Sequence, residues 1–107
     1  MAATYKVLGQ SAPSATTATT LLTAGSATII STLNAANLGS TQDTIRIAVR
    51  PAGATLANQH YIAYGVPLAA GAVFSMQGGI TLANTDVVTV YTTTGNTVFS
   101  AFGSDGN

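Results

Sequence analysis

Residues 44–66, TIRIAVRPAGATLANQHYIAYGV, decide the fold because they contain two strand patterns joined by a short connection. Apolar and other side chains alternate along residues 43–50, as they do in a strand with one face against a core. Pro51 opens the connection, since proline cannot donate a hydrogen bond to a strand ladder. Residues 59–66 resume the extended pattern, and Pro67 is expected to end it. The stretch therefore predicts an antiparallel hairpin.

The hydrophobic pattern also predicts the register of this hairpin. Placing Ile47 opposite Ile62 separates the apolar side chains from the polar ones, whereas a shift of one residue mixes them. The core face then carries Ile45, Ile47, Val49 and Ile62, with Tyr64 opposite Ile45 and His60 opposite Val49 at the rim. The outer face carries Arg46, Ala48, Arg50, Gln59, Tyr61 and Ala63.

The same alternation recurs along most of the chain, and helical periodicity is almost absent. Turn residues separate about eight short strand segments, which we expect at 4–9, 19–23, 27–37, 43–50, 59–66, 71–76, 86–92 and 97–102. The tripeptide at 77–79 (Gln-Gly-Gly) is expected to be a turn, and helix is possible only in fragments at 55–59 and 81–86. This pattern predicts an all-β fold, namely an antiparallel β-sandwich with a jelly-roll-like topology.

The length of 107 residues fits one β-sandwich domain spanning residues 1–107. Residues 10–18 are rich in Ser, Thr, Ala and Pro, so residues 1–18 are alternatively an extended N-terminal arm. The chain has no cysteine, and it shows no signal-peptide pattern and no long apolar run. We therefore expect a protein made in the cytoplasm and no membrane partner.

Charged residues make up 6% of the chain, against about 25% in ordinary soluble domains. The three basic and three acidic residues cancel, and a weakly charged surface of zero net charge favours association. A surface that neighbours will cover avoids charges, because each buried charge must be desolvated or paired. The composition predicts a component of an assembly; compositional drift in a stable secreted-type β domain is the alternative.

Catalytic and cofactor sites are not indicated by the residues present. His60 and Asp43 lack a nucleophile in a suitable sequence setting, and the aspartates at 43, 86 and 105 lack the spacing of metal ligands. There is no glutamate to complete a glycosidase pair, and three cations cannot form a basic stripe for nucleic acid. We expect no enzyme activity, no cofactor, no metal site and no nucleic-acid partner.

The outer face of the predicted hairpin carries Arg46, Arg50 and Tyr61. Arginine and tyrosine are enriched at interface hot spots, and an arginine over a ring gains cation–π energy. These three residues are therefore the candidate interface. The alternative is a solvated sheet face on which two arginines improve solubility.

Four runs of the sequence resemble a known class of proteins: 4–23 (TYKVLGQSAPSATTATTLLT), 44–68 (TIRIAVRPAGATLANQHYIAYGVPL), 79–91 (GITLANTDVVTVY) and 99–106 (FSAFGSDG). They are similar to small all-β virion structural proteins of tailed phages, particularly phages that infect cyanobacteria. The most distinctive part is 46–64, with the Arg-Pro-Ala-Gly turn at 50–53. The chain departs from the resemblance at 71–79, where a more polar segment is expected.

The resemblance implies an oligomeric virion component without catalysis. We expect a capsid decoration or cement protein that forms homo-oligomers and contacts the major capsid protein or tail proteins. The alternative is a tail, neck or fibre component, including an adhesive module that binds the host surface. An adhesive module is expected to have aromatic side chains in loops, whereas Tyr61, Tyr64 and Tyr91 fall in predicted strands.

Overall fold

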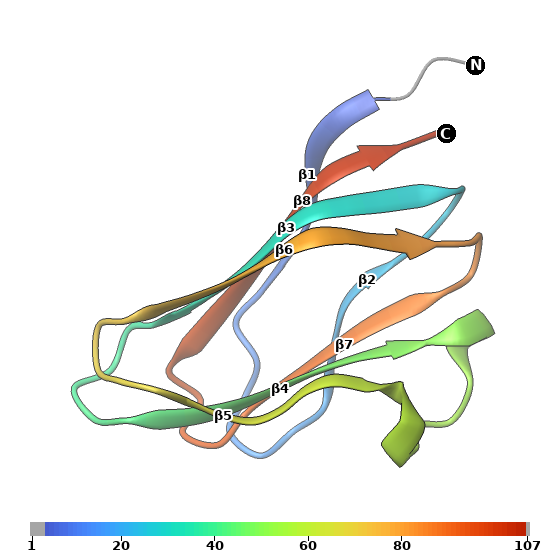
Figure 1. Ribbon diagram of the computed structural model, residues 1–107. Coiled ribbons are helices and arrows are strands. Elements are labelled where there is room, and N and C mark those ends of the chain that lie inside the picture. Colours follow the sequence, from blue (N-terminus) through green and yellow to red (C-terminus); the bar gives the residue numbers. More distant parts are fainter. Residues whose placement is uncertain (1–3, 107) are drawn as a thin grey trace.

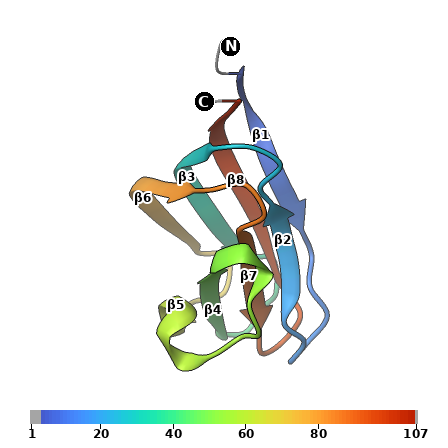
Figure 2. The same ribbon diagram turned by 90° about the vertical axis from the view of Figure 1, so that its right-hand side faces the viewer.

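The computed structural model describes residues 4–106, which form two stacked antiparallel sheets of four strands each (Figure 1). The first sheet has the order β1 (Thr4–Ser11), β8 (Thr97–Asp105), β3 (Thr28–Asn37) and β6 (Val73–Leu82). The second sheet has the order β2 (Thr19–Thr23), β7 (Val87–Thr92), β4 (Asp43–Arg50) and β5 (Tyr61–Leu68). Figure 2 shows the two layers from another side.

Four antiparallel strand pairs are nested along the chain. The first strand pairs with the last (β1 with β8), and the nesting continues inward through β2 with β7, β3 with β6 and β4 with β5. A long hairpin of this kind, folded over into two facing sheets, is a jelly roll. The structure thus confirms the prediction of an all-β antiparallel sandwich of about eight strands.

Two segments of the first sheet differ from the sequence prediction. The expected turn at 77–79 lies inside β6, where a bulge breaks the register with β3 between Ile30 and Thr32. Gly78 and Gly79 accommodate it with φ angles of 129° and 79°, which favour glycine. Residues 4–11 of the proposed N-terminal arm are the edge strand β1, paired with β8, while residues 1–3 lie outside the described part.

Two features of the second sheet also differ from expectation. Pro67 does not end β5, because β5 is an edge strand and an edge position tolerates the missing N–H. The connection from β4 to β5 contains two short 3₁₀ turns, η1 (Pro51–Gly53) and η2 (Asn58–His60). The fragment at 81–86 is not helical; it contains the end of β6 and a turn.

The core lies between the sheets and follows the predicted alternation. Its largest fully buried apolar side chains come from β3, β4, β7 and β8: Ile30, Leu33, Ile45, Ile47, Val88, Val90 and Phe99. Val49 is partly buried and packs against this cluster. His60 is buried, but it lies in a 3₁₀ turn before β5 rather than in a strand opposite Val49, and its Nδ1 accepts a hydrogen bond from the backbone N–H of Ala57 at 3.0 Å.

The predicted register of the β4–β5 hairpin is right at Ala48, which pairs with Tyr61, but it is one residue out at Ile47 and two residues out at Ile45. Ile47 pairs with Ala63 rather than Ile62, because bulges shift the register on both sides of the Arg46–Ile47 step. Ala63 therefore points into the core, while Ile62 is 44% exposed. Tyr64, expected on the core face, pairs with Arg46 on the outer face and is 61% exposed.

A buried carboxylate joins the two sheets at one end of the sandwich. Asp43, which is 1% exposed, accepts hydrogen bonds from the hydroxyls of Thr92 in β7 and Thr97 in β8. It also accepts bonds from the backbone N–H groups of Thr44 at 2.7 Å, Thr93 at 3.1 Å and Thr94 at 3.1 Å. Burial alone raises the pKa of Asp43, but these hydrogen bonds outweigh it and lower the pKa from 3.8 to about 2.

The register of β5 can be tested by paired truncations. We expect Ile47→Ala to lower the free energy of unfolding by about 2–5 kcal/mol, because it opens a cavity in the core. Ile62→Ala is the matched control and should cost under about 1 kcal/mol, since Ile62 is 44% exposed and lies outside the core. Urea unfolding followed by circular dichroism measures both values. A larger loss for Ile62→Ala than for Ile47→Ala would restore the register predicted from the sequence.

The role of Asp43 can be tested by the pH dependence of stability. Because its folded pKa is depressed, its contribution is complete above about pH 4 and is lost as the pH falls toward 2. We expect Asp43→Asn to destabilise the fold by about 3 kcal/mol or more at neutral pH, since buried donors lose their acceptor. The free energy of unfolding of the variant should also change less between about pH 4 and pH 2 than that of the wild type.

Asp105→Asn is the control for this substitution. Asp105 makes a 2.9 Å ion pair with the half-exposed Lys6, and such surface pairs contribute about 1 kcal/mol or less. Equal destabilisation by the two asparagine variants would contradict the central role of Asp43.

Candidate binding surface

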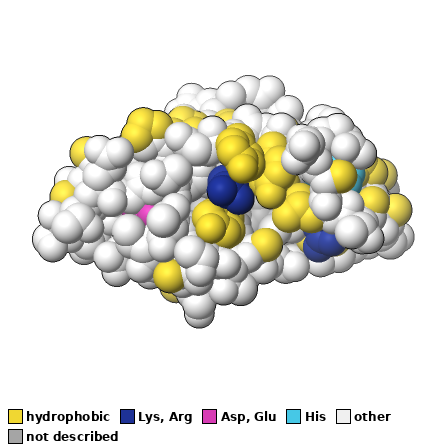
Figure 3. Space-filling model, turned by 90° about the horizontal axis from the view of Figure 1, so that it is seen from below, with side chains coloured by type: hydrophobic (Ala, Val, Ile, Leu, Met, Phe, Trp, Pro, Cys, Tyr) yellow, Lys and Arg dark blue, Asp and Glu magenta, His cyan; other side chains and the backbone are white. Residues whose placement is uncertain are grey.

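An arginine lies between two tyrosine rings on the outer face of the second sheet. Arg46 in β4 is directly opposite Tyr64 in β5 and Tyr91 in β7. Its guanidinium carbon is 4.4 Å from the centroid of the Tyr64 ring and 4.3 Å from that of Tyr91. We call these three residues the Arg46 row. In Figure 3, a basic side chain at the middle of this face is flanked by hydrophobic ones.

Strand alternation and the hairpin bulges place the three side chains in this row. Ile45 and Ile47 point into the core, so Arg46 between them points outward. The fully buried Val90 and Thr92 likewise leave Tyr91 on the outer face of β7. Residues opposite one another on neighbouring strands are close enough for their side chains to interact, which brings the cation between the rings.

The positive charge of Arg46 has no carboxylate partner among residues 4–106. Within residues 4–106, the ion pair between Lys6 and Asp105 is the one observed, and it belongs to the first sheet. The Nε atom of Arg46 is buried and makes no hydrogen bond to the described chain. The two rings stabilise the cation through their electron-rich faces, so Arg46 is held in place with hydrogen-bonding capacity unused.

An open hollow adjoins the Arg46 row. It is lined by Asn58 in η2 and by Tyr61 and Tyr64 in β5. The two rings meet nearly at right angles, with their centroids 4.9 Å apart and their planes inclined by 80°. The hollow therefore combines aromatic surface with an amide that can both donate and accept hydrogen bonds.

Arg50 stabilises the loop between β4 and β5 through two hydrogen bonds. Its Nε donates to the Thr89 hydroxyl at 3.0 Å, and its Nη1 donates to the Ala54 carbonyl at 3.0 Å. The same loop is held by Asp86, whose carboxylate accepts bonds from the backbone N–H groups of Ala52 and Ala83, each at 2.9 Å. These two hydrogen bonds lower the pKa of Asp86, and the bond from Ala52 has the larger effect.

The three predicted interface residues thus lie in three different settings. Arg46 belongs to the row and Tyr61 to the adjoining hollow, whereas Arg50 is occupied by the loop. Tyr91 was missed, although the alternation of β7 could have placed it outward. Asn58 and Tyr64 were also missed, and no sequence signal identifies them, because their positions depend on the 3₁₀ turn and the bulges.

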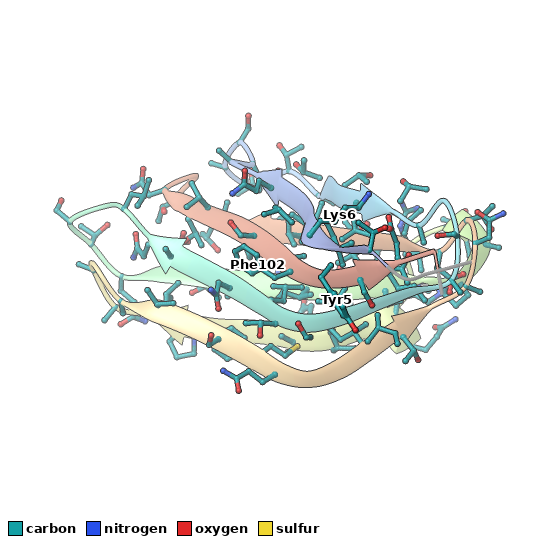
Figure 4. All side chains as sticks on the ribbon, turned by 90° about the horizontal axis from the view of Figure 1, so that it is seen from above. Tyr5, Lys6 and Phe102 are labelled. Atoms are coloured by element: carbon teal, nitrogen blue, oxygen red, sulfur yellow. The ribbon has the colours of Figure 1, made fainter. Side chains whose placement is uncertain are left out.

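The outer face of the first sheet carries a second candidate surface, which we call the β1 patch. It consists of Tyr5, Val7, Ile29 and Phe102; Tyr5 is 85% exposed, and Val7 lies directly opposite Phe102. Figure 4 looks down on this face and labels Tyr5 and Phe102. Exposed apolar side chains that gather on one face are typical of contact surfaces.

The described residues, 4–106, contain no cluster of three or more His, Cys, Asp or Glu side chains able to hold a metal ion. None of the helices in that range is long and apolar enough to cross a membrane. Comparisons with protein-family models, curated proteins and solved structures give no match.

Proposed function

We propose that this chain is a structural component of a phage virion, most specifically a capsid decoration or cement protein. The observation that carries the proposal is the β1 patch, where Tyr5, Val7 and Ile29 remain exposed on one sheet face. Burying these side chains against a shell protein removes apolar surface from water and stabilises the contact.

The composition and the sequence resemblance support the same proposal. With charged residues at 6% of the chain, a partner can cover this surface without desolvating many ions. The resemblance to small virion proteins of tailed phages covers nearly the whole chain. Jelly rolls also occur in viral capsids, although a fold alone does not determine function.

We propose that the first sheet faces the particle. Its edge strand β1 can also pair with a strand of a neighbouring subunit, because the backbone groups along a sheet edge are free to accept a further strand. A subunit that binds only the assembled shell stabilises that shell by mass action. The set of Arg46, Arg50 and Tyr61 remains the competing proposal for this contact.

Attachment to particles that lack the protein tests the proposal. We expect the purified wild-type chain to co-sediment with such particles and to raise their temperature of disruption. The double variant Tyr5→Ser and Val7→Ser should bind at least about tenfold more weakly, because each apolar contact contributes about 1.5 kcal/mol or more.

The variant Arg46→Ala with Arg50→Ala is the matched control, and we expect it to attach like the wild type. If it loses attachment while the β1-patch variant binds normally, the contact lies on the second sheet. A wild-type chain that does not attach at all would overturn the proposal.

The second candidate function is that of a tail, neck or fibre component, including an adhesive module for the host surface. The hollow lined by Asn58, Tyr61 and Tyr64 favours it, because an aromatic corner beside an amide is suited to surface carbohydrate. Binding of the isolated chain to host cells, with no attachment to tail-less shells, would favour this function over decoration.

A further inference from the structure

We infer that the hollow lined by Asn58, Tyr61 and Tyr64 is a carbohydrate-binding site, and that Arg46 beside it favours a sugar bearing a carboxylate. This inference does not depend on where in a particle the chain resides. It rests on the shape of the aromatic corner, on the packing of Tyr64 against Arg46 and on the unpaired charge at its margin.

The two tyrosine rings form a corner that suits one pyranose ring. Their planes are inclined by 80°, and their centroids are 4.9 Å apart, so the rings form two walls meeting at an angle. The face of an aromatic ring is electron-rich and attracts the weakly positive C–H groups on the apolar face of a sugar. The Asn58 amide can donate to and accept from sugar hydroxyls, which fix the orientation of the ligand.

The Tyr64 wall is held in place before any ligand arrives. Its ring packs against the Arg46 guanidinium at 4.4 Å, and Arg46 is held from the other side by Tyr91 at 4.3 Å. The cost of ordering side chains on binding is correspondingly small. A ring that is 61% exposed yet fixed in this way is suited to serve as a platform.

The charge at the margin of the hollow favours an acidic sugar. The three aspartates are occupied elsewhere: Asp43 by buried donors, Asp86 by two backbone N–H groups and Asp105 by Lys6. The Nε of Arg46 is buried, whereas its two terminal Nη groups make no hydrogen bond within residues 4–106 and remain for a ligand. A planar guanidinium matches the geometry of a carboxylate.

Titration of the full chain with D-galacturonic acid and D-galactose, followed by NMR, tests the inference. The two sugars differ in having a carboxylate or a hydroxymethyl group at C6. We expect millimolar binding of both, with shifts confined to the hollow and the Arg46 row. Galacturonate should bind about threefold more tightly, and added salt should reduce that preference.

Three variants separate the contributions. Tyr64→Ala should weaken binding of both sugars by about tenfold. If the alanine variant does not fold, Tyr64→Phe takes its place; this variant retains the aromatic ring and should therefore retain binding. Arg46→Gln should remove the difference in affinity between galacturonate and galactose. Tyr5→Ala changes an exposed tyrosine on the opposite sheet and should leave both affinities unchanged.

Several outcomes would overturn the inference. Shifts absent from the hollow for both sugars, or spread evenly over the surface, would exclude a sugar site. Equal affinity for the two sugars would remove the preference for a carboxylate. Because the titration uses the isolated chain, its failure leaves the decoration proposal standing. If hollow variants instead lose attachment to particles, the hollow is a protein contact.

Discussion

The buried carboxylate of Asp43 is the interaction on which the arrangement of the two sheets depends. It lies in β4 of the second sheet and accepts hydrogen bonds from Thr92 in β7 and from Thr97, the first residue of β8 in the first sheet. The same group accepts bonds from the backbone of the β7–β8 turn. A single side chain thereby joins both sheets and closes one end of the sandwich. Its five donors would each be costly to leave unpaired.

The contacts that the charged side chains make within the fold determine which charged groups remain available on the surface. All three aspartates serve the chain itself, and Arg50 and Lys6 are occupied as well. Arg46, in contrast, has neither an acidic nor a hydrogen-bonding partner among the described residues, and two tyrosine rings hold it on the outer face. The opposite sheet presents the apolar β1 patch. The molecule therefore has two chemically different faces, and we assign the apolar one to the particle and the aromatic one to an external ligand.

The strands could be predicted from the sequence, whereas the candidate site could be predicted only in part. Alternation located all eight strands, because the side-chain period of a half-buried strand is directly visible in residues such as Ile45, Ile47 and Val49. The β4–β5 register failed because bulges cannot be read from alternation, and Tyr64 and Ala63 changed faces as a result. The packing of Arg46 against Tyr91 required the strand order β7-β4-β5, which brings together residues far apart in the chain.

The proposed place of this chain can be tested by cryo-electron microscopy of phage particles assembled with it. We expect copies at symmetric positions on the shell, with the β1 patch against the capsid protein and the Arg46 row facing outward. Copies whose Arg46 row is buried against the shell, or an intact shell with no copy of the chain on it, would contradict the account.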